Sequence, residues 1–463
     1  MTHSPRSLKA RAYRTIWRWH FYAGLFVIPF VLLLAVTGAA YLFKPQVERW
    51  EERAFQGLPV AGAVAPQRQV DAALTAFPGA RFNSYRLPER TGDAAMVHLA
   101  MPDGRSMRDV FVAPRGEVLG SIDPDMRVMA WVRSIHGQLL LGKRGSWLVE
   151  LAASWAIVLV LSGLYLWWPR GRGFAGVVWP RFKGGRRIVW RDFHAVTGFW
   201  ISGLVLVLLV TGLPWAGLWG SAFKAARTEM GWVNGPQTWT LGGEAPSSGG
   251  SDMHAAHDHA AMMQAMPVPA PPVPAVGIDD IVARAMLERL AFPVIVTPPG
   301  APGQFGAPGV MAWTVRSDAQ NRPLQMRITY DRATGRETAR EGFADGHVAD
   351  RIVGYGVAWH EGQLFGWMNQ LVGVLTAIGL IVMAVSGFVL WRRRKPDNAL
   401  GAPPSAKVPA RMGGVVVILL LLAALLPLLA ISLVLLWLFE RLALPHLPRV
   451  AQWLGVSGRA RIA

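Results

Sequence analysis

The chain has 463 residues, of which 52% are hydrophobic, and it carries a formal net charge of +18 with no cysteine. The lack of cysteine excludes a disulfide framework, a thiolate-held iron–sulfur cluster and covalent haem attachment through a Cys-x-x-Cys-His motif. The apolar fraction favours a membrane protein, in which a redox cofactor would be held by His, Met, Tyr or carboxylate side chains.

Five apolar stretches are each long enough to cross a bilayer as a helix, which takes about 20 residues. They lie at 21–43, 147–168, 196–218, 367–391 and 412–438. A basic lead, residues 1–20, precedes the first stretch. That stretch is too long for a signal peptide, and Tyr41-Leu-Phe-Lys44 after it is a poor cleavage site. We therefore predict a retained transmembrane helix.

The positive charge is concentrated in three segments, namely 1–20, 169–195 and 392–411. Under the positive-inside rule these segments are cytoplasmic, so the charge reflects membrane topology and not nucleic-acid binding. Segments 44–146 and 219–366 are then external, which is the periplasmic side if the membrane is a bacterial inner membrane. The tail at 439–463 would also be external, although its arginines oppose that assignment.

Each external segment is predicted to hold a small α+β module. The first has a short helix at 68–77 and a hairpin at 109–120 that turns at a Pro-Arg-Gly sequence. The second has helical spacing at 278–290 and strand-like pieces on either side of Asp331-Arg-Ala-Thr-Gly-Arg-Glu337. An insertion at 242–277, rich in Gly, Ser, Ala and Pro, is predicted to be a flexible tether.

Two half-repeats organise the chain, and each carries two histidines. His20 and His194 stand at the basic end of an apolar run, and a Thr-Gly pair follows each of them seventeen residues later. His136 and His360 occur in matching His-Gly-Gln-Leu and His-Glu-Gly-Gln-Leu sequences. An apolar run that ends in Ser-Gly and a tryptophan follows each of these two histidines.

Topology sorts the four histidines into one pair at each membrane face. His20 and His194 begin helices that run outward, whereas His136 and His360 precede helices that run inward. Seventeen residues of helix rise about 25 Å, so the two pairs would be separated by most of the bilayer. This pattern predicts a four-helix bundle with a bis-imidazole haem at each end, because bundle cores build cofactor sites from facing helices.

Each residue of this pattern also has a structural interpretation that involves no cofactor. A single interfacial histidine beside tryptophan is more often a polar anchor, but four at equivalent positions favour ligation. Arg18 and Arg191 are placed to meet haem propionates, or they determine topology. Gly24 and Gly198 would let a macrocycle approach the backbone, or they serve close helix packing.

The insertion contains a cluster of imidazoles and thioethers that suits copper, with iron as the other candidate metal. Its members are His254, His257, His259, Met253, Met262, Met263 and Met266. The alternative interpretation is a low-complexity linker in which these residues have no metal-binding role.

The chain resembles the PepSY-associated transmembrane family, which includes iron-regulated membrane proteins and ferric-siderophore reductases. The resemblance covers roughly residues 8–395 and rests on the four histidine motifs and the Ser-Gly-x-x-Leu-Trp span ends. It implies b-type haem on His20, His136, His194 and His360, and PepSY modules in the external segments. The expected fold is a membrane α-helical protein: a four-helix haem-binding bundle from two half-repeats, a fifth C-terminal span and two external α+β PepSY-like modules.

The implied function is transmembrane electron transfer that reduces an external ferric, siderophore-type complex during iron uptake. No Gly-x-Gly-x-x-Gly sequence lies between a predicted strand and helix, so the electrons would come from quinol or a separate cytoplasmic reductase. Two other functions remain open: a non-catalytic membrane anchor whose PepSY modules bind a partner or regulate a protease, and copper handling by the His/Met cluster.

Four further residues receive weaker predictions. His98 is expected at the surface of a strand-like segment, and His347 is a candidate neighbour of the external histidine site. Asp192 and Glu361 lie beside two of the ligand histidines, where each either orients an imidazole or is solvated.

Overall fold

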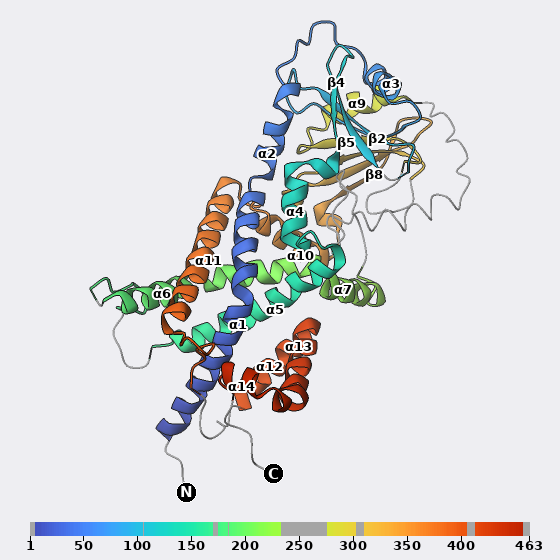
Figure 1. The fold of residues 1–463 in the computed structure, drawn as a ribbon. Coiled ribbons are helices and arrows are strands. Elements are labelled where there is room, and N and C mark those ends of the chain that lie inside the picture. The colour runs from blue at the N-terminus through green and yellow to red at the C-terminus, as the bar shows by residue number, and fades with distance from the viewer. Residues whose placement is uncertain are drawn as a thin grey trace. The chain divides into compact units, whose positions relative to one another are not determined.

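The computed structural model describes residues 5–104, 106–169, 175–183, 185–232, 276–301, 310–404 and 413–456. The chain forms two compact units, which Figure 1 shows in ribbon form. The helical unit contains residues 1–39, 136–219 and 371–463, and the sheet unit contains residues 40–135 and 220–370. Each unit is therefore assembled from segments that are far apart in the sequence.

Long apolar helices make up the helical unit, since lipid offers no partner for an unpaired backbone group. Five helical segments are long and apolar enough to cross a membrane: Arg11–Tyr41, Gly142–Trp167, Gly185–Trp215, Trp367–Arg394 and Pro427–His446. The helices of this unit and of its boundaries are α1 (Pro5–Tyr41), α5 (Gly142–Trp167), α6 (Gly185–Gly212), α7 (Gly217–Glu229), α11 (Trp367–Arg394), α12 (Gly413–Leu425), α13 (Pro427–Leu438) and α14 (Pro448–Trp453).

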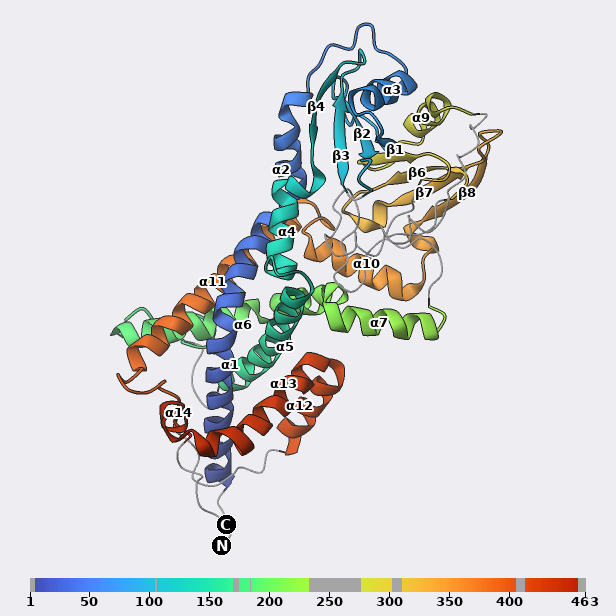
Figure 2. The same ribbon diagram turned by 45° about the vertical axis from the view of Figure 1, so that its right-hand side comes forward.

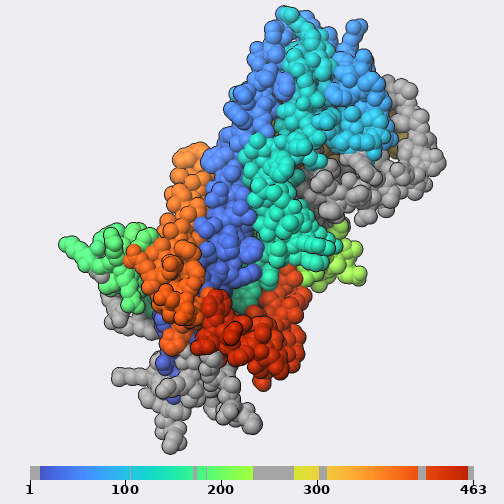
Figure 3. Space-filling view, viewed as in Figure 1, coloured from blue at the N-terminus to red at the C-terminus, as the bar shows by residue number. Residues whose placement is uncertain are grey.

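Small residues let the helices of this unit approach closely. A β carbon at Gly24 of α1 would lie 3.8 Å from Leu159 of α5, and one at Gly198 of α6 would lie 2.9 Å from Met383 of α11. These two glycines therefore contact neighbouring helices in the way that the packing alternative expects. Figure 3 shows α1 in blue running beside α11 in orange.

The apolar run that the sequence predicted as one fifth span, 412–438, is two helices. Pro427 lacks a backbone N–H and begins α13 after a break at Leu426. The 13 residues of α12 rise only about 20 Å, which is less than the bilayer core. The two helices fold back beside one another (Figures 1 and 2), and Leu426 and Leu429 pack against Ile157 and Val158 of α5.

The C-terminal part of the chain returns to the N-terminal half of α1. The Tyr22 hydroxyl donates a hydrogen bond to the Leu454 carbonyl at 2.5 Å, and the Arg18 guanidinium donates to the Gly455 carbonyl at 3.2 Å. At the end of α11, the Arg394 guanidinium lies 5.1 Å from the centre of the Trp17 ring. The described segment after α11 thus begins and ends at the same end of the helical unit. The predicted external position of the tail at 439–463 stays a prediction.

The sheet unit repeats one order of elements. A helix, four strands, a short 3-10 turn and a second helix occur twice. The first set is α3 (Pro66–Ala76), β1 (Arg81–Arg86), β2 (Ala95–Ala100), β3 (Met107–Val112), β4 (Val118–Ile122) and α4 (Val128–Gln138). The second set is α9 (Ile278–Leu287), β5 (Val294–Thr297), β6 (Trp313–Ser317), β7 (Met326–Tyr330), β8 (Glu337–Gly342) and α10 (Val348–His360). Helix α2 (Lys44–Glu51) precedes the first set.

The two sets of strands form a single antiparallel sheet of order β4-β3-β2-β1-β5-β6-β7-β8. They join where β1 pairs with β5, with Tyr85 opposite Val296 and Arg86 opposite Ile295. The sequence predicted two separate modules, and this pairing unites them. Figure 2 shows α3 and α9 over the sheet that results.

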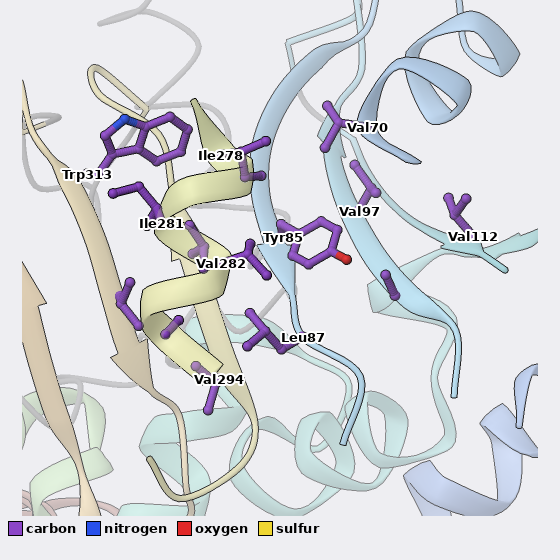
Figure 4. Packing of buried hydrophobic residues seen from close by; sticks show 14 of the residues in the cluster. Val70, Tyr85, Leu87, Val97, Val112, Ile278, Ile281, Val282, Val294 and Trp313 are labelled. Carbon is purple, nitrogen blue, oxygen red and sulfur yellow. The ribbon is translucent and has the colours of Figure 1, made fainter. Parts of the chain in front are cut away.

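One apolar core spans the junction between the two sets. Val97 of β2, Val296 of β5 and Val315 of β6 are fully buried in it. Figure 4 shows Ile278, Ile281 and Val282 on one side of α9, with Tyr85 of β1 nearby. Because side chains alternate along each strand, the face away from α3 and α9 carries other residues. They include His98 and Asp109 as well as a smaller apolar cluster around Met96 and Phe111.

Candidate functional site

His20 and His194 lie opposite one another in the helical unit. Their ring centroids are 6.4 Å apart and their planes are inclined at 85°. Two imidazoles bound to opposite sides of one metal by bonds of about 2 Å would have ring centroids about 6 Å apart. The separation of the two rings therefore fits a pair of axial ligands on a single metal.

The surroundings of His20 decide which ring nitrogen carries the proton. Nδ1 of His20 lies 2.9 Å from Oγ of Ser162 in α5. That hydroxyl donates its single proton to the Leu159 carbonyl of its own helix, at 3.1 Å. With its proton on that carbonyl, the hydroxyl accepts from Nδ1 of His20, and in this tautomer Nε2 keeps a lone pair for a metal.

His194 has the same arrangement on α11. Its Nδ1 lies 3.1 Å from the Met383 carbonyl and 3.1 Å from Oγ of Ser386. A carbonyl can only accept, so Nδ1 of His194 must donate and its Nε2 is again the unprotonated nitrogen. Ser386 also donates to the Met383 carbonyl, as Ser162 does to Leu159.

His136 repeats the arrangement a third time, with a threonine in place of the serine. Its Nδ1 lies 2.9 Å from Oγ1 of Thr37 in α1. The Thr37 hydroxyl donates to the Leu33 carbonyl at 2.7 Å, so it accepts from His136. Since α1 carries both His20 and Thr37, the two histidine positions in the helical unit are separated by about 25 Å of helix rise.

A glycine follows each of the three hydroxyl residues and lies against the imidazole. A β carbon at Gly163 would lie 3.2 Å from Cε1 of His20, and one at Gly387 would lie 3.3 Å from Cε1 of His194. At Gly38 the corresponding distance to Cε1 of His136 is 3.1 Å. Any larger residue would press on the ring, so these glycines set how closely each histidine approaches the neighbouring helix.

His360 belongs to the sheet unit, where it is the last residue of α10. The turn after it is fixed by polar contacts: Glu361 is buried and pairs with Arg322 at 3.3 Å, and Asn369 donates to the Trp359 carbonyl at 3.1 Å. His347 caps the opposite end of α10, where its Nδ1 accepts from the Ala349 amide. It therefore does not flank His360 as the sequence suggested.

A second ion pair lies close to this turn. Lys44 donates to Glu48 at 2.9 Å at the start of α2. Burial lowers the pKa of Lys44, but its anionic and polar neighbours, chiefly Glu48 with a smaller effect of Glu361, together outweigh burial, so the net pKa is raised. Lys44 thus stays charged.

The two predicted propionate partners have other contacts. Arg18 donates to the Pro403 carbonyl at 2.5 Å and to the Tyr22 hydroxyl at 3.1 Å, which anchors the C-terminal segment. Arg191 donates to its neighbour Asp192 at 2.6 Å. Both contacts are structural ones, and the prediction that these arginines meet propionates stays a prediction.

The two carboxylates next to the histidines, those of Asp192 and Glu361, form ion pairs with arginines. Asp192 has no exposed surface and accepts from the backbone and side chain of Arg181 as well as from Arg191. It fixes the segment at 175–183 against the start of α6. Glu361 pairs with Arg322, as described above. Neither carboxylate is solvated, and the contacts that the structure gives them are not with an imidazole.

His98 is buried on the face of the sheet away from α3 and α9, so its predicted surface position is wrong. Its Nδ1 lies 2.7 Å from Asp109, which also accepts from Arg127 at 3.0 Å. Arg127 pairs in turn with Glu52 at 3.0 Å, and Glu52 also accepts from Arg86. The network ties strands β1, β2 and β3 to the start of α4.

The predicted His/Met cluster lies outside the described residues. Within the part of the chain that the structure describes, no group of three or more His, Asp or Glu side chains could hold a metal ion. A pair of histidines suits a haem, since the macrocycle supplies the remaining ligands of the iron.

The model of the PepSY-associated TM region family matches residues 17–394. The chain belongs to this family. The match contains all four repeat histidines and ends at the last residue of α11. With the apolar helices described above, membership identifies the chain as a membrane protein. No curated protein matches the chain.

The hydroxyl and glycine partners of the histidines are the site residues of this family member that the sequence did not assign. Ser162-Gly163, Ser386-Gly387 and Thr37-Gly38 were visible only as landmarks of the repeat. Their recurrence was the available signal: in each half-repeat a hydroxyl residue and a glycine stand at the same distance from a histidine motif. A fourth pair, Thr211-Gly212, completes the pattern in the sequence.

Proposed function

We propose that this PepSY-associated membrane protein transfers electrons across a bacterial inner membrane through two b-type haems and reduces an external ferric complex. The geometry of His20 and His194 is the observation that carries the proposal. Two imidazoles face one another at a separation suited to one metal, and both have Nδ1 bound to protein oxygen atoms. A histidine that served only as a polar anchor at the membrane surface would need neither a facing imidazole nor a fixed Nδ1.

The second haem is proposed from the repeat. His136 stands in the same hydroxyl and glycine setting as His20 and His194, which marks it as a ligand of the same kind. His360 is its counterpart in the other half-repeat, so it is the proposed second ligand. The two proposed sites would then lie near opposite faces of the membrane.

The protein's part in this function is to hold and orient the ligands. Nδ1–H groups held by hydroxyl and carbonyl oxygens keep each ring in one tautomer and one orientation. A haem held by both imidazoles would exchange single electrons and would leave no iron site open to oxygen. The histidines lie at partly buried positions on packed helices, which would limit how far the protein rearranges when the charge of the iron changes.

An iron complex is the proposed acceptor on the external side. Hard oxygen donors hold Fe(III) more tightly than Fe(II), so one-electron reduction would release the metal from a siderophore-type chelate. The described residues include no nicotinamide- or flavin-binding α/β domain, so quinol or a separate cytoplasmic reductase is the proposed donor.

The test is the absorbance spectrum of the purified full chain, oxidised and dithionite-reduced, after expression with added haem. We expect a b-type difference spectrum with two haems per chain. His20→Ala and His194→Ala should each remove the signal of one haem. His446→Ala is the matched control, because His446 is exposed and has no part in the repeat.

Reduction of a ferric chelate by membranes supplied with quinol then tests the reaction. A chain that binds no haem, or one whose difference spectrum survives loss of both His20 and His194, would rule out the proposal. It would favour the non-catalytic anchor instead.

A further inference from the structure

His20, His194 and His136 share one arrangement of neighbours around Nδ1, the ring nitrogen that would not bind a metal. In each case Nδ1 meets the hydroxyl of a Ser or Thr on a neighbouring helix, at 2.9 Å for His20, 3.1 Å for His194 and 2.9 Å for His136. The residue after that hydroxyl is a glycine whose α carbon faces Cε1 of the ring. Ser162, Ser386 and Thr37 come from three different helices, so no single local sequence effect produces the arrangement.

Each hydroxyl is itself fixed by its own helix. Ser162 donates to Leu159, Ser386 to Met383 and Thr37 to Leu33. A hydroxyl has one proton, and the contacts with the backbone carbonyls provide an acceptor for it. The oxygen is therefore committed as an acceptor toward the imidazole, which holds the proton on Nδ1.

We propose that Ser162, Ser386 and Thr37 are positioning residues that set the reduction potential of the groups bound by His20, His194 and His136. The proposal rests on the proposed function, since it requires a redox metal on Nε2. An acceptor on Nδ1–H draws the proton away from the ring and makes Nε2 a stronger electron donor. A stronger donor favours the oxidised metal, so the hydroxyls lower the potential.

The alternative is that these hydroxyls only form a hydrogen bond with the backbone of their own membrane helix and have no effect on the histidines. Serine and threonine often donate to the carbonyl one turn earlier. Ser202 and Thr376 are examples in this chain: Ser202 donates to Phe199 at 2.8 Å, and Thr376 donates to Val372 at 2.7 Å. They are matched controls for the serines and for Thr37.

The experiment measures haem content and midpoint potentials of the full chain in detergent by spectroscopic redox titration. Ser162→Ala and Ser386→Ala are compared with Ser202→Ala. Thr37→Val, which keeps the shape and removes the hydroxyl, is compared with Thr37→Ser and with Thr376→Val. We expect the potential of one haem to shift upward in Ser162→Ala and Thr37→Val. The shift should be smaller in Ser386→Ala, where the Met383 carbonyl remains as an acceptor for Nδ1 of His194. Both controls and Thr37→Ser should keep the wild-type value.

A variant that loses haem altogether still tests the role of the hydroxyl. If Ser162→Ala loses it and Ser162→Thr regains it, the hydroxyl positions the ligand as proposed. Hydroxyl-free variants that keep both haems at wild-type potentials would overturn the proposal. A wild-type chain without haem would refute the proposed function first, and this inference with it, so the two failures are told apart by the wild-type spectrum alone.

Discussion

Gly387 lies directly against the imidazole of His194, so that a β carbon there would stand 3.3 Å from Cε1 and 3.6 Å from Nδ1 of the ring. The same backbone segment supplies the acceptors for that Nδ1, at Met383 and Ser386. A single stretch of α11 therefore determines the distance, the orientation and the tautomer of one proposed ligand. Four predictions follow from this and from other contacts.

Gly387→Ala should displace the His194 ring and reduce haem binding at the proposed inner site. The added methyl would lie closer to Cε1 than about nine in ten real β-carbon contacts do, so the ring or the helix must move by a few tenths of an ångström. Gly203→Ala in α6 is the control, because a β carbon there meets no atom within 4 Å. Haem stoichiometry and the reduced absorbance spectrum provide the measurement, and equal spectra for the two variants would contradict the close approach.

The two ends of the chain should be accessible from the same side of the membrane. The chain has no cysteine, so a single introduced thiol reports its own position. Gln452→Cys and Arg14→Cys, both at exposed positions, should react with an impermeant maleimide from the same side, which is the cytoplasmic side in the proposed topology. Asp71→Cys in the sheet unit should react from the other side. Labelling of Gln452→Cys together with Asp71→Cys would show that the segment after α11 crosses the membrane.

Asp192→Asn should loosen the segment before α6 and lower the free energy of unfolding by about 1.5–3 kcal/mol, the range for hydrogen bonds to a charged group. Asp192 is fully buried, and asparagine keeps its shape while removing the charge that Arg181 and Arg191 share. Faster tryptic cleavage at Arg181 and a lower melting temperature in detergent are the expected signs. Asp280→Asn, at an exposed position of α9, should change neither.

Acid should destabilise the sheet unit through Asp109. Burial raises the pKa of this carboxyl, but His98 and Arg127 together outweigh burial and hold its pKa below the ordinary value. A depressed folded-state pKa gives stability that is present above the unfolded value of about 3.9 and is lost as the pH falls through the folded value. The melting temperature should therefore change little from pH 7 to pH 5 on account of this group and fall below about pH 4.

Asp109→Asn tests that assignment. It should lower the melting temperature at pH 7 and lose less stability below about pH 4 than the wild type does. Asp71→Asn, at an exposed position on α3, should keep the wild-type profile. Parallel acid profiles for wild type and Asp109→Asn would mean that other carboxyls account for the loss.

Local patterns in the sequence carried much of the architecture. Runs of apolar residues predict membrane helices because lipid leaves the backbone no other partner, and the helical character of this membrane protein is confirmed. The spacing of His20, His136, His194 and His360 within two half-repeats singled out candidate ligands before any contact was known. The apolar runs each lie within one helix, and the histidine motifs recur along the chain. One sequence is therefore enough to reveal both.

Contacts between distant segments decided the rest. Pairing of Tyr85 with Val296 joins two modules into one sheet, and no local pattern encodes which edges meet. Pro427 was visible in the sequence, but only the tertiary structure shows that Leu454 returns to Tyr22 of α1. The hydroxyl partners of the histidines come from other helices, since a tautomer is fixed by whatever packing brings to Nδ1. The sequence by itself determined which residues are candidate ligands, and the tertiary structure decided how each is held.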